Sequence, residues 1–163
     1  MAVSLAIETR GLTKSYGRVQ ALRGVDLEVR QGEMFGFLGP NGAGKTTTIR
    51  CLLDLIRPNG GSLRVLGLDP QKQPLAVRRR VGYLPGELRL DDTLTVEGQL
   101  RYLSHVRGGK ADWARTRRMC DRLDLDLKPL TRNLSKGNKQ KVGVVQALMH
   151  RSELLLMDEP TFG

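Results

Sequence analysis

The sequence predicts an α/β fold organised around a phosphate-binding loop. Residues 39–46, Gly-Pro-Asn-Gly-Ala-Gly-Lys-Thr, fit the pattern G-x-x-x-x-G-K-[ST]. This loop lies between an apolar β-type run and a helix-compatible run, the context in which the pattern is specific. Far downstream, an apolar strand at Leu154–Met157 ends in two adjacent carboxylates. A mere glycine-rich turn is the alternative, and this context disfavours it.

The N-terminal part, residues 4–38, is predicted to be rich in strands. We expect a strand at Leu5–Thr9 and another at Val25–Val29, where apolar and polar residues alternate with period two. A turn follows at Gln31–Glu33. The next run, Met34–Leu38, is apolar on both faces, which is typical of a central parallel strand that is covered on both sides.

The loop itself predicts a site for nucleotide phosphates. Its glycines let successive backbone N–H groups turn toward one point, and the helix expected to begin at about Gly44 directs its positive end there. Lys45 adds a charge for the β- and γ-phosphates, and the Thr46 hydroxyl can bind Mg²⁺. The loop does not choose between ATP and GTP. The predicted nucleotide contacts are Gly39, Pro40, Asn41, Gly42, Ala43, Gly44, Lys45, Thr46 and Thr47.

The middle of the chain predicts two more strands around a basic helix. Pro58–Gly61 should end the helix that follows the loop, which is expected over Thr47–Leu55. Strands are expected at Ser62–Leu66 and Val81–Pro85, with a helical stretch at Leu75–Arg80 between them.

From Thr95 onward the sequence predicts helices. Thr95 and Ser135 are candidate N-caps of the first and third helix. The apolar faces of the three helices are expected to contain Leu100, Leu103 and Val106; then Trp113, Thr116, Cys120 and Leu123; then Val142, Val145 and Met149.

The carboxylates after the last strand predict phosphoryl-transfer chemistry. Asp158 would hold Mg²⁺ from the side opposite Thr46, and Glu159 would polarise the water that attacks the γ-phosphate. Such a reaction needs mainly positioning and charge neutralisation, so Glu159 and Lys45 are the predicted catalytic residues. A solvated strand end is the simpler alternative.

Composition limits the cellular setting and the partners. The 163 residues carry a net charge of +10. That charge suits nucleic acid, an anionic membrane surface or an acidic partner. Because no aromatic residues are interleaved with the arginines, nucleic acid is disfavoured as a partner. Cys51 and Cys120 lack metal-ligand spacing and are expected to be buried free thiols. No apolar run has the length of a membrane span, so a cytoplasmic location is expected.

Taken together, the motifs resemble those of the ATP-binding cassette (ABC) transporter family, in the correct order over essentially the whole chain. Gly39–Thr46 is similar to the Walker A loop, and Leu154–Asp158 to the Walker B strand with Glu159 as catalytic glutamate. Leu134–Asn138 resembles the L-S-G-G-Q signature. The resemblance implies a P-loop NTPase fold with an antiparallel β part, a parallel core sheet and a helical subdomain. It divides the chain into a nucleotide-binding core (1–85), a helical subdomain (86–150) and the Walker B strand (151–163).

The family resemblance also implies partners and further contacts. Two cassettes pair head to tail, so Ser135 and Gly137 of one copy would contact the γ-phosphate of ATP on the other. Tyr16 falls at the position of the aromatic residue that stacks on adenine. The implied function is an ATPase subunit of a drug-exporter-like transporter, bound to a membrane permease at the inner face of the membrane. A homodimer with ATP and Mg²⁺ is expected.

Three departures from the family pattern leave alternatives open. Lys136 and Asn138 replace signature residues, Gly86 followed by Glu87 stands where a glutamine is usual, and the chain ends before the D-loop and switch histidine of the family. We therefore expect that residues 1–163 alone do not sustain ATP hydrolysis. A soluble cassette protein acting on ribosomes or DNA, and a truncated nucleotide binder without turnover, are the alternative functions.

Overall fold

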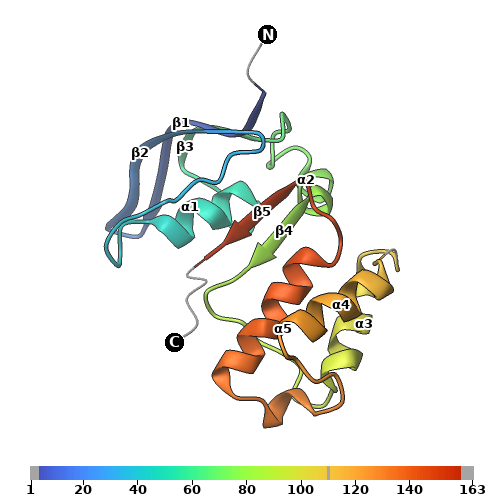
Figure 1. Cartoon of the computed structure of the whole chain (residues 1–163). Helices are drawn as coiled ribbons and strands as arrows, with labels where there is room; N and C mark the ends of the chain where they lie inside the picture. The colour runs from blue at the N-terminus through green and yellow to red at the C-terminus, as the bar shows by residue number, and fades with distance from the viewer. Residues whose placement is uncertain (1–3, 110, 159–163) are drawn as a thin grey trace. The chain divides into compact units, whose positions relative to one another are not determined.

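The computed structural model describes residues 4–109 and 111–158, and the chain divides into two compact units at the junction between Arg80 and Val81. Figure 1 shows the helices and strands of each unit. Glu159, the predicted catalytic glutamate, lies outside the described residues.

The first unit is built on a three-stranded antiparallel sheet with the order β2-β1-β3. The strands are β1 (Leu5–Tyr16), β2 (Val19–Arg30) and β3 (Gly60–Val65). The first two are longer than predicted because cross-strand pairing extends the ladder from Leu5↔Arg30 to Tyr16↔Val19, far beyond the alternating stretches. The two helices of this unit are α1 (Lys45–Leu52) and α2 (Pro74–Arg80), close to their predicted positions.

The predicted strand at Met34–Leu38 is wrong for this structure. These residues have no strand assignment, and the Leu38 side chain is 91% exposed. A strand exists only where a neighbour accepts and donates its backbone hydrogen bonds. Within the described residues the strands pair only as β2-β1-β3 and β4-β5, so no edge is paired with this run. Its apolar pattern is therefore present without the ladder that would stabilise it.

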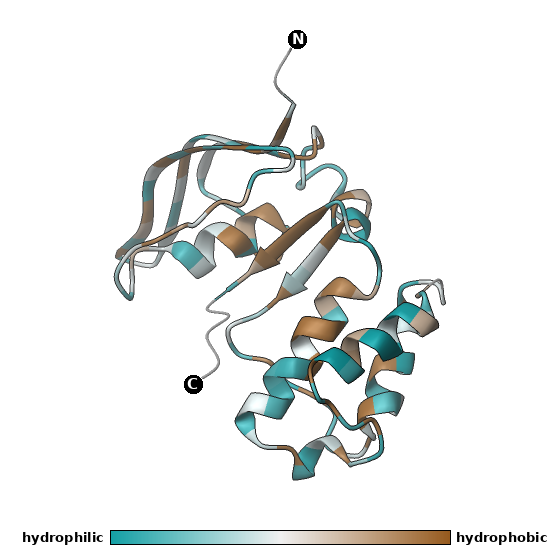
Figure 2. Ribbon diagram, in the orientation of Figure 1, coloured by the Kyte–Doolittle hydropathy of each residue, from teal (hydrophilic) through white to brown (hydrophobic). Residues whose placement is uncertain are grey.

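The second unit combines a parallel strand pair with a helical core. β4 (Val81–Leu84) pairs in parallel with β5 (Leu154–Met157), and Figure 2 shows β5 as strongly hydrophobic. The helices are α3 (Val96–Val106), α4 (Trp113–Arg122) and α5 (Lys136–Leu148), with a short 3-10 helix at Thr131–Asn133.

The helix starts follow their capping residues. Thr95 Oγ1 accepts a hydrogen bond from the Gly98 N–H at 3.0 Å, and Ser135 Oγ accepts one from the Asn138 N–H at 3.2 Å. Both predicted caps are confirmed, because each side chain replaces an acceptor that the first turn of a helix lacks. Asp112 caps α4 in the same way, accepting from the Arg115 N–H at 2.9 Å.

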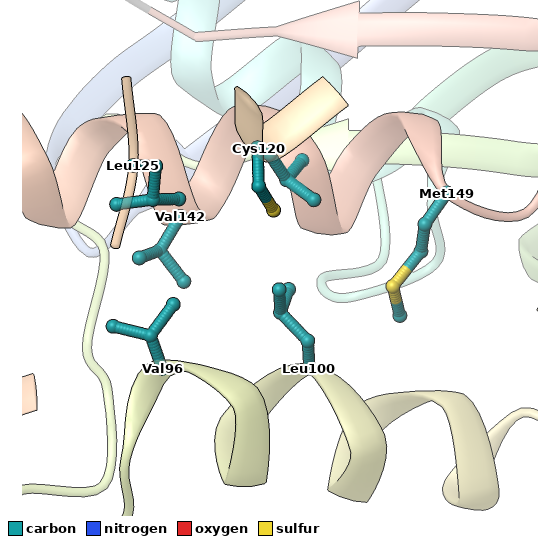
Figure 3. Packing of buried hydrophobic residues seen from close by; sticks show 7 residues of the cluster. Val96, Leu100, Cys120, Leu125, Val142 and Met149 are labelled. Carbon is teal, nitrogen blue, oxygen red and sulfur yellow. The ribbon is translucent and has the colours of Figure 1, made fainter. Parts of the chain in front are cut away.

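The core of the second unit lies between α3, α4 and α5. In Figure 3, side chains of α3 point toward those of α5 across the cluster. Its buried members are Val96, Leu100, Cys120, Leu125, Val142, Val145 and Met149. The predicted faces of α4 and α5 are confirmed, and both cysteines are buried free thiols. The prediction fails at Val106, which is exposed because it lies in the last turn of α3, while Val96 is buried in the cluster from the first turn.

Close backbone approach fixes α5 on β4. A Cβ at Gly143 would lie 2.6 Å from Leu84 Cδ1 and 2.7 Å from Leu88 Cδ2, and a Cβ at Gly82 would collide with the carbonyl of Ala147. Only glycine fits at these two positions without a shift of the neighbouring atoms. The helix that starts at Ser135 is thus seated on the strand that leads to Gly86.

Candidate nucleotide-binding site

The phosphate-binding loop closes around the amino end of α1. Gly44 is the N-cap of that helix, with φ +87°, a left-handed conformation that favours glycine. A Cβ there would lie 2.6 Å from both the Ala21 carbonyl oxygen and Leu22 Cδ2 of β2. Conformation and space therefore both require glycine at Gly44, and strand β2 acts as the support of the loop.

Lys45 holds the loop in a curled form. Its Nζ donates to the carbonyl oxygens of Gly39 at 2.6 Å and Pro40 at 3.0 Å, and the Ala43 N–H donates to Pro40 O at 3.1 Å. Thr48 Oγ1 donates back to Gly44 O at 3.0 Å, which stabilises the first turn of α1. The ammonium group of Lys45 is thus placed within the loop, at the positive end of a helix with no acidic residue in its first turn.

The other predicted loop residues flank Lys45 on both sides in the sequence. Asn41 and Gly42 are exposed, and Gly42 has φ +83° with open space around it. Thr46 and Thr47 are half-buried in the first turn of α1, where backbone N–H groups lack acceptors inside the helix. A loop of this kind is a concave anion site lined by N–H groups and one lysine.

Tyr16 lies in the same unit, at the tip of the β1–β2 hairpin. The residue is 47% exposed, and Lys14 Nζ lies 5.4 Å from the centroid of its ring. A hydrogen bond from outside the hairpin holds its tip in place: Asn59 Oδ1 accepts from the Ser15 N–H at 2.7 Å. Tyr16 pairs with Val19, and Ala21, which touches Gly44, is about 7 Å further along that strand. An exposed, fixed aromatic face near the loop suits base stacking.

Replacing Tyr16 with alanine should weaken ATP binding roughly ten-fold, because one stacked base contributes about 1–3 kcal/mol. Tyr16→Trp should be tolerated, since it keeps the aromatic face. A fluorescence titration with a labelled ATP analogue measures both. Normal ATP affinity in Tyr16→Ala would mean that the residue only packs.

Asp158 lies at the carboxyl end of the parallel strand pair in the second unit. Its N–H donates to Leu84 O at 2.9 Å, and the residue is only 4% exposed. The sequence did not predict its neighbour: a Cβ at Gly86 would lie 3.8 Å from Asp158 Oδ2. The one feature of the sequence that could have indicated this proximity is Gly86-Glu87 at the position where the family has a glutamine. Within the described residues, no cluster of three or more His, Cys, Asp or Glu side chains is placed to hold a metal ion.

The signature residues lie at the exposed amino end of α5. Ser135 is exposed, and a Cβ at Gly137 would meet no atom within 4 Å. No acidic residue occupies the first turn of α5. This helix end is therefore open to an approaching anion and positive in potential. The combined site of Thr46 and Asp158 stays a prediction, since the two residues belong to different units.

The two histidines of the chain, His105 and His150, are not among the predicted site residues. His105 is exposed on α3, while His150 follows α5 with its Nε2 buried and without a hydrogen-bond partner among residues 4–109 and 111–158. Burial, and then the nearby charge of Arg107, lower the pKa of His150. This favours the neutral imidazole.

The fold and the phosphate-binding loop define a P-loop nucleotide-binding protein of the α/β class. The family model described as ABC transporter matches residues 22–162. The chain is 39% identical to the daunorubicin/doxorubicin resistance ATP-binding protein DrrA of Streptomyces peucetius, covering 97% of this chain and 49% of DrrA. It is 36% identical to the bacitracin transport ATP-binding protein BcrA of Bacillus licheniformis, covering 99% of this chain and 53% of BcrA. The chain therefore belongs to the ABC transporter family.

Solved structures give the same fold. The ATP-binding subunit of an ABC transporter superposes with a TM-score of 0.84 at 32% identity, covering 96% of this chain and 67% of that chain. A dimeric bacterial ABC transporter cassette superposes with a TM-score of 0.82 at 24% identity, covering 95% of this chain and 74% of that one, which is evidence for the fold alone. The chain spans about half the length of DrrA and BcrA. In its described residues, none of the helices has the length and apolar character needed to cross a membrane.

Proposed function

We propose that this chain is the ATP-binding and ATP-hydrolysing part of an ABC exporter, which couples ATP use at a pair of cassettes to export through a membrane permease. The observation that carries the proposal is Lys45 held within a glycine loop at the amino end of α1. DrrA is named for daunorubicin/doxorubicin resistance and BcrA for bacitracin transport, which favours an exporter over a ribosome-acting or DNA-acting cassette.

In this proposal, residues 39–47 bind the phosphates through backbone N–H groups, and Lys45 binds the β- and γ-phosphates. To do so Lys45 exchanges the carbonyls of Gly39 and Pro40 for phosphate oxygens. Tyr16 stacks on the adenine. The phosphate loop and the hairpin share strand β2 as their support, so base and phosphate contacts would be held by one rigid element.

The residues present fit Mg²⁺. Asp158 offers carboxylate oxygens at the end of β5, and Thr46 offers a hydroxyl, which are the hard ligands that Mg²⁺ prefers. Gly86 lies beside Asp158 and carries no side chain, so at this position the chain lacks the glutamine that the family pattern has. When bound, Mg²⁺ would supply charge neutralisation on the phosphates. Glu159 would orient the attacking water.

The signature helix would complete the site of a second copy. Ser135 and the Gly137 N–H, at the open end of α5, would contact the γ-phosphate of ATP bound to the partner cassette. Ser135 Oγ accepts from the Asn138 N–H, and its hydroxyl can at the same time donate its own hydrogen to a phosphate oxygen. The described side chains therefore suit a homodimer with two shared sites.

The test compares Glu159→Gln with Ser135→Arg in a full-length version of the protein. Glu159→Gln should keep ATP bound, lose phosphate release and elute as a dimer with Mg-ATP, because the water loses its orienting carboxylate. Ser135→Arg should also lose turnover but bind ATP as tightly as the wild-type monomer and remain monomeric. If Glu159→Gln stays monomeric with Mg-ATP across a wide concentration range, the paired-cassette mechanism is wrong.

A further inference from the structure

A second surface of the helical unit carries an unusual arrangement of charge. Arg115, Arg118 and Arg122 are three and four residues apart and so share one face of α4. With Met119, Asp121 and Leu148 they line an open groove of about 700 Å³. Leu148 ends α5, so the groove lies along α4 at the end of α5 opposite Ser135.

The groove has a fixed wall and two available cations. Arg115 is held in place because its guanidinium donates to Leu148 O at 2.7 Å. Arg118 and Arg122 are exposed, and neither forms a salt bridge in the part of the chain that the structure describes. An arginine without a carboxylate partner keeps five donors for a ligand.

Two acidic residues near α4, Glu97 and Asp112, form their ion pairs with arginines outside the groove. Glu97 lies 2.7 Å from Arg101 and 3.8 Å from Arg117. Asp112 lies 2.9 Å from Arg151, and its carboxylate also interacts electrostatically with Arg118, without an ion pair between them. Among the described residues that line the groove, Asp121 is the one that brings a carboxylate, against three arginines. The groove is thus positive because its neighbours' carboxylates are used in other ion pairs, and charge complementarity selects an acidic ligand.

The residues that line the groove also indicate the shape and polarity of the ligand that it would bind. Met119 and Leu148 are half-buried and give the groove an apolar floor between the cations. None of the lining residues that the structure describes is aromatic, so no side chain among them offers a surface on which a base could stack, which disfavours nucleic acid. The volume is that of a site for a few side chains. A concave groove with charged walls fits a peptide better than the planar surface of a lipid bilayer.

We propose that this groove binds an acidic segment of a partner protein. Carboxylates of the segment pair with Arg118 and Arg122, and an apolar side chain packs on Met119 and Leu148. The 13 residues of α5 place this site about 20 Å from Ser135, so a bound segment leaves the signature end of the helix open. The inference is independent of nucleotide binding and of the transported substrate.

The probe is a fluorescein-labelled heptapeptide, Asp-Glu-Leu-Glu-Asp-Leu-Glu, followed by fluorescence anisotropy with the whole chain. Arg118→Glu/Arg122→Glu should weaken binding at least about ten-fold, since charge reversal replaces attraction by repulsion. The matched control is Arg23→Glu/Arg30→Glu, which makes the same change in net charge at exposed positions of β2 and should bind within about two-fold of wild type. Replacing both peptide leucines with serine should also weaken binding, because the floor is apolar.

Three results would overturn the proposal. The wild-type chain could fail to bind the acidic peptide, or both double variants could lose binding equally, which means bulk charge attraction only. Alternatively, vesicles of anionic phospholipid could bind in an Arg118- and Arg122-dependent way while the peptide does not, which assigns the face to a membrane surface. Circular dichroism of each variant checks that the helices remain, and a variant that loses them is replaced by Arg118→Gln/Arg122→Gln.

Discussion

Lys45→Ala should weaken Mg-ATP binding about 10- to 100-fold, because a charge-assisted hydrogen bond contributes about 1.5–3 kcal/mol. The structure adds a reason for this magnitude. Lys45 Nζ lies 2.6 and 3.0 Å from two loop carbonyls, so the side chain is already ordered within the loop, but it gives up these two hydrogen bonds when it binds phosphate, which keeps the net loss within this range. Isothermal titration of ATP into wild type and variant measures the effect.

Lys72→Ala is the matched control for this experiment. It removes the same charge from the same unit, and the Lys72 side chain is exposed, with only a 3.8 Å contact to Asp69. We expect its ATP affinity to equal that of wild type. Equal titration curves for Lys45→Ala and wild type would refute the assignment of the loop as a nucleotide site.

Gly44→Ala should lower both the free energy of unfolding and the affinity for ATP. The left-handed conformation costs alanine about 1–2 kcal/mol, and the collision of its Cβ with Ala21 and Leu22 adds about 1–3 kcal/mol. The total, about 2–5 kcal/mol, is a large part of the about 5–15 kcal/mol that stabilises a domain. Movement of the loop away from β2 would also misalign its N–H groups.

The variant Gly42→Ala separates the cost of the left-handed conformation from the cost of the Cβ collision. Gly42 has nearly the same φ, +83° against +87° at Gly44, but no atom lies within 4 Å of a Cβ built there. It should therefore show only the conformational cost, about 1–2 kcal/mol. Urea unfolding of both variants measures the difference. Equal destabilisation of the two would mean that the contact of Gly44 with β2 contributes nothing.

The elements that were predicted correctly are those encoded by local patterns. Thr95 and Ser135 were identified as caps because a cap depends on one side chain and an N–H three residues away. The buried face of α5 followed from the helical period. The parallel pairing of β5 with β4, by contrast, joins residues about 70 positions apart, and no local pattern specifies that register.

The same reasoning explains the failure at Met34–Leu38. Its composition predicted a central strand, yet a strand depends on partners whose position the segment itself does not encode. Hydrogen-exchange protection should consequently be low in this run compared with β1, whose backbone pairs on both sides with β2 and β3.

The sequence by itself determined the helix caps at Thr95 and Ser135 and the buried face of α5, since each depends on residues that are neighbours in the chain. It also predicted the chemistry of the loop and of the carboxylate after β5, and both stay predictions. Only the tertiary structure decided that β2 supports Gly44, that Gly86 lies beside Asp158, and that the arginines of α4 share a groove with Leu148. These contacts join segments that are distant in sequence. They arise because burial of apolar faces brings whole elements together, and the side chains at their edges then become neighbours.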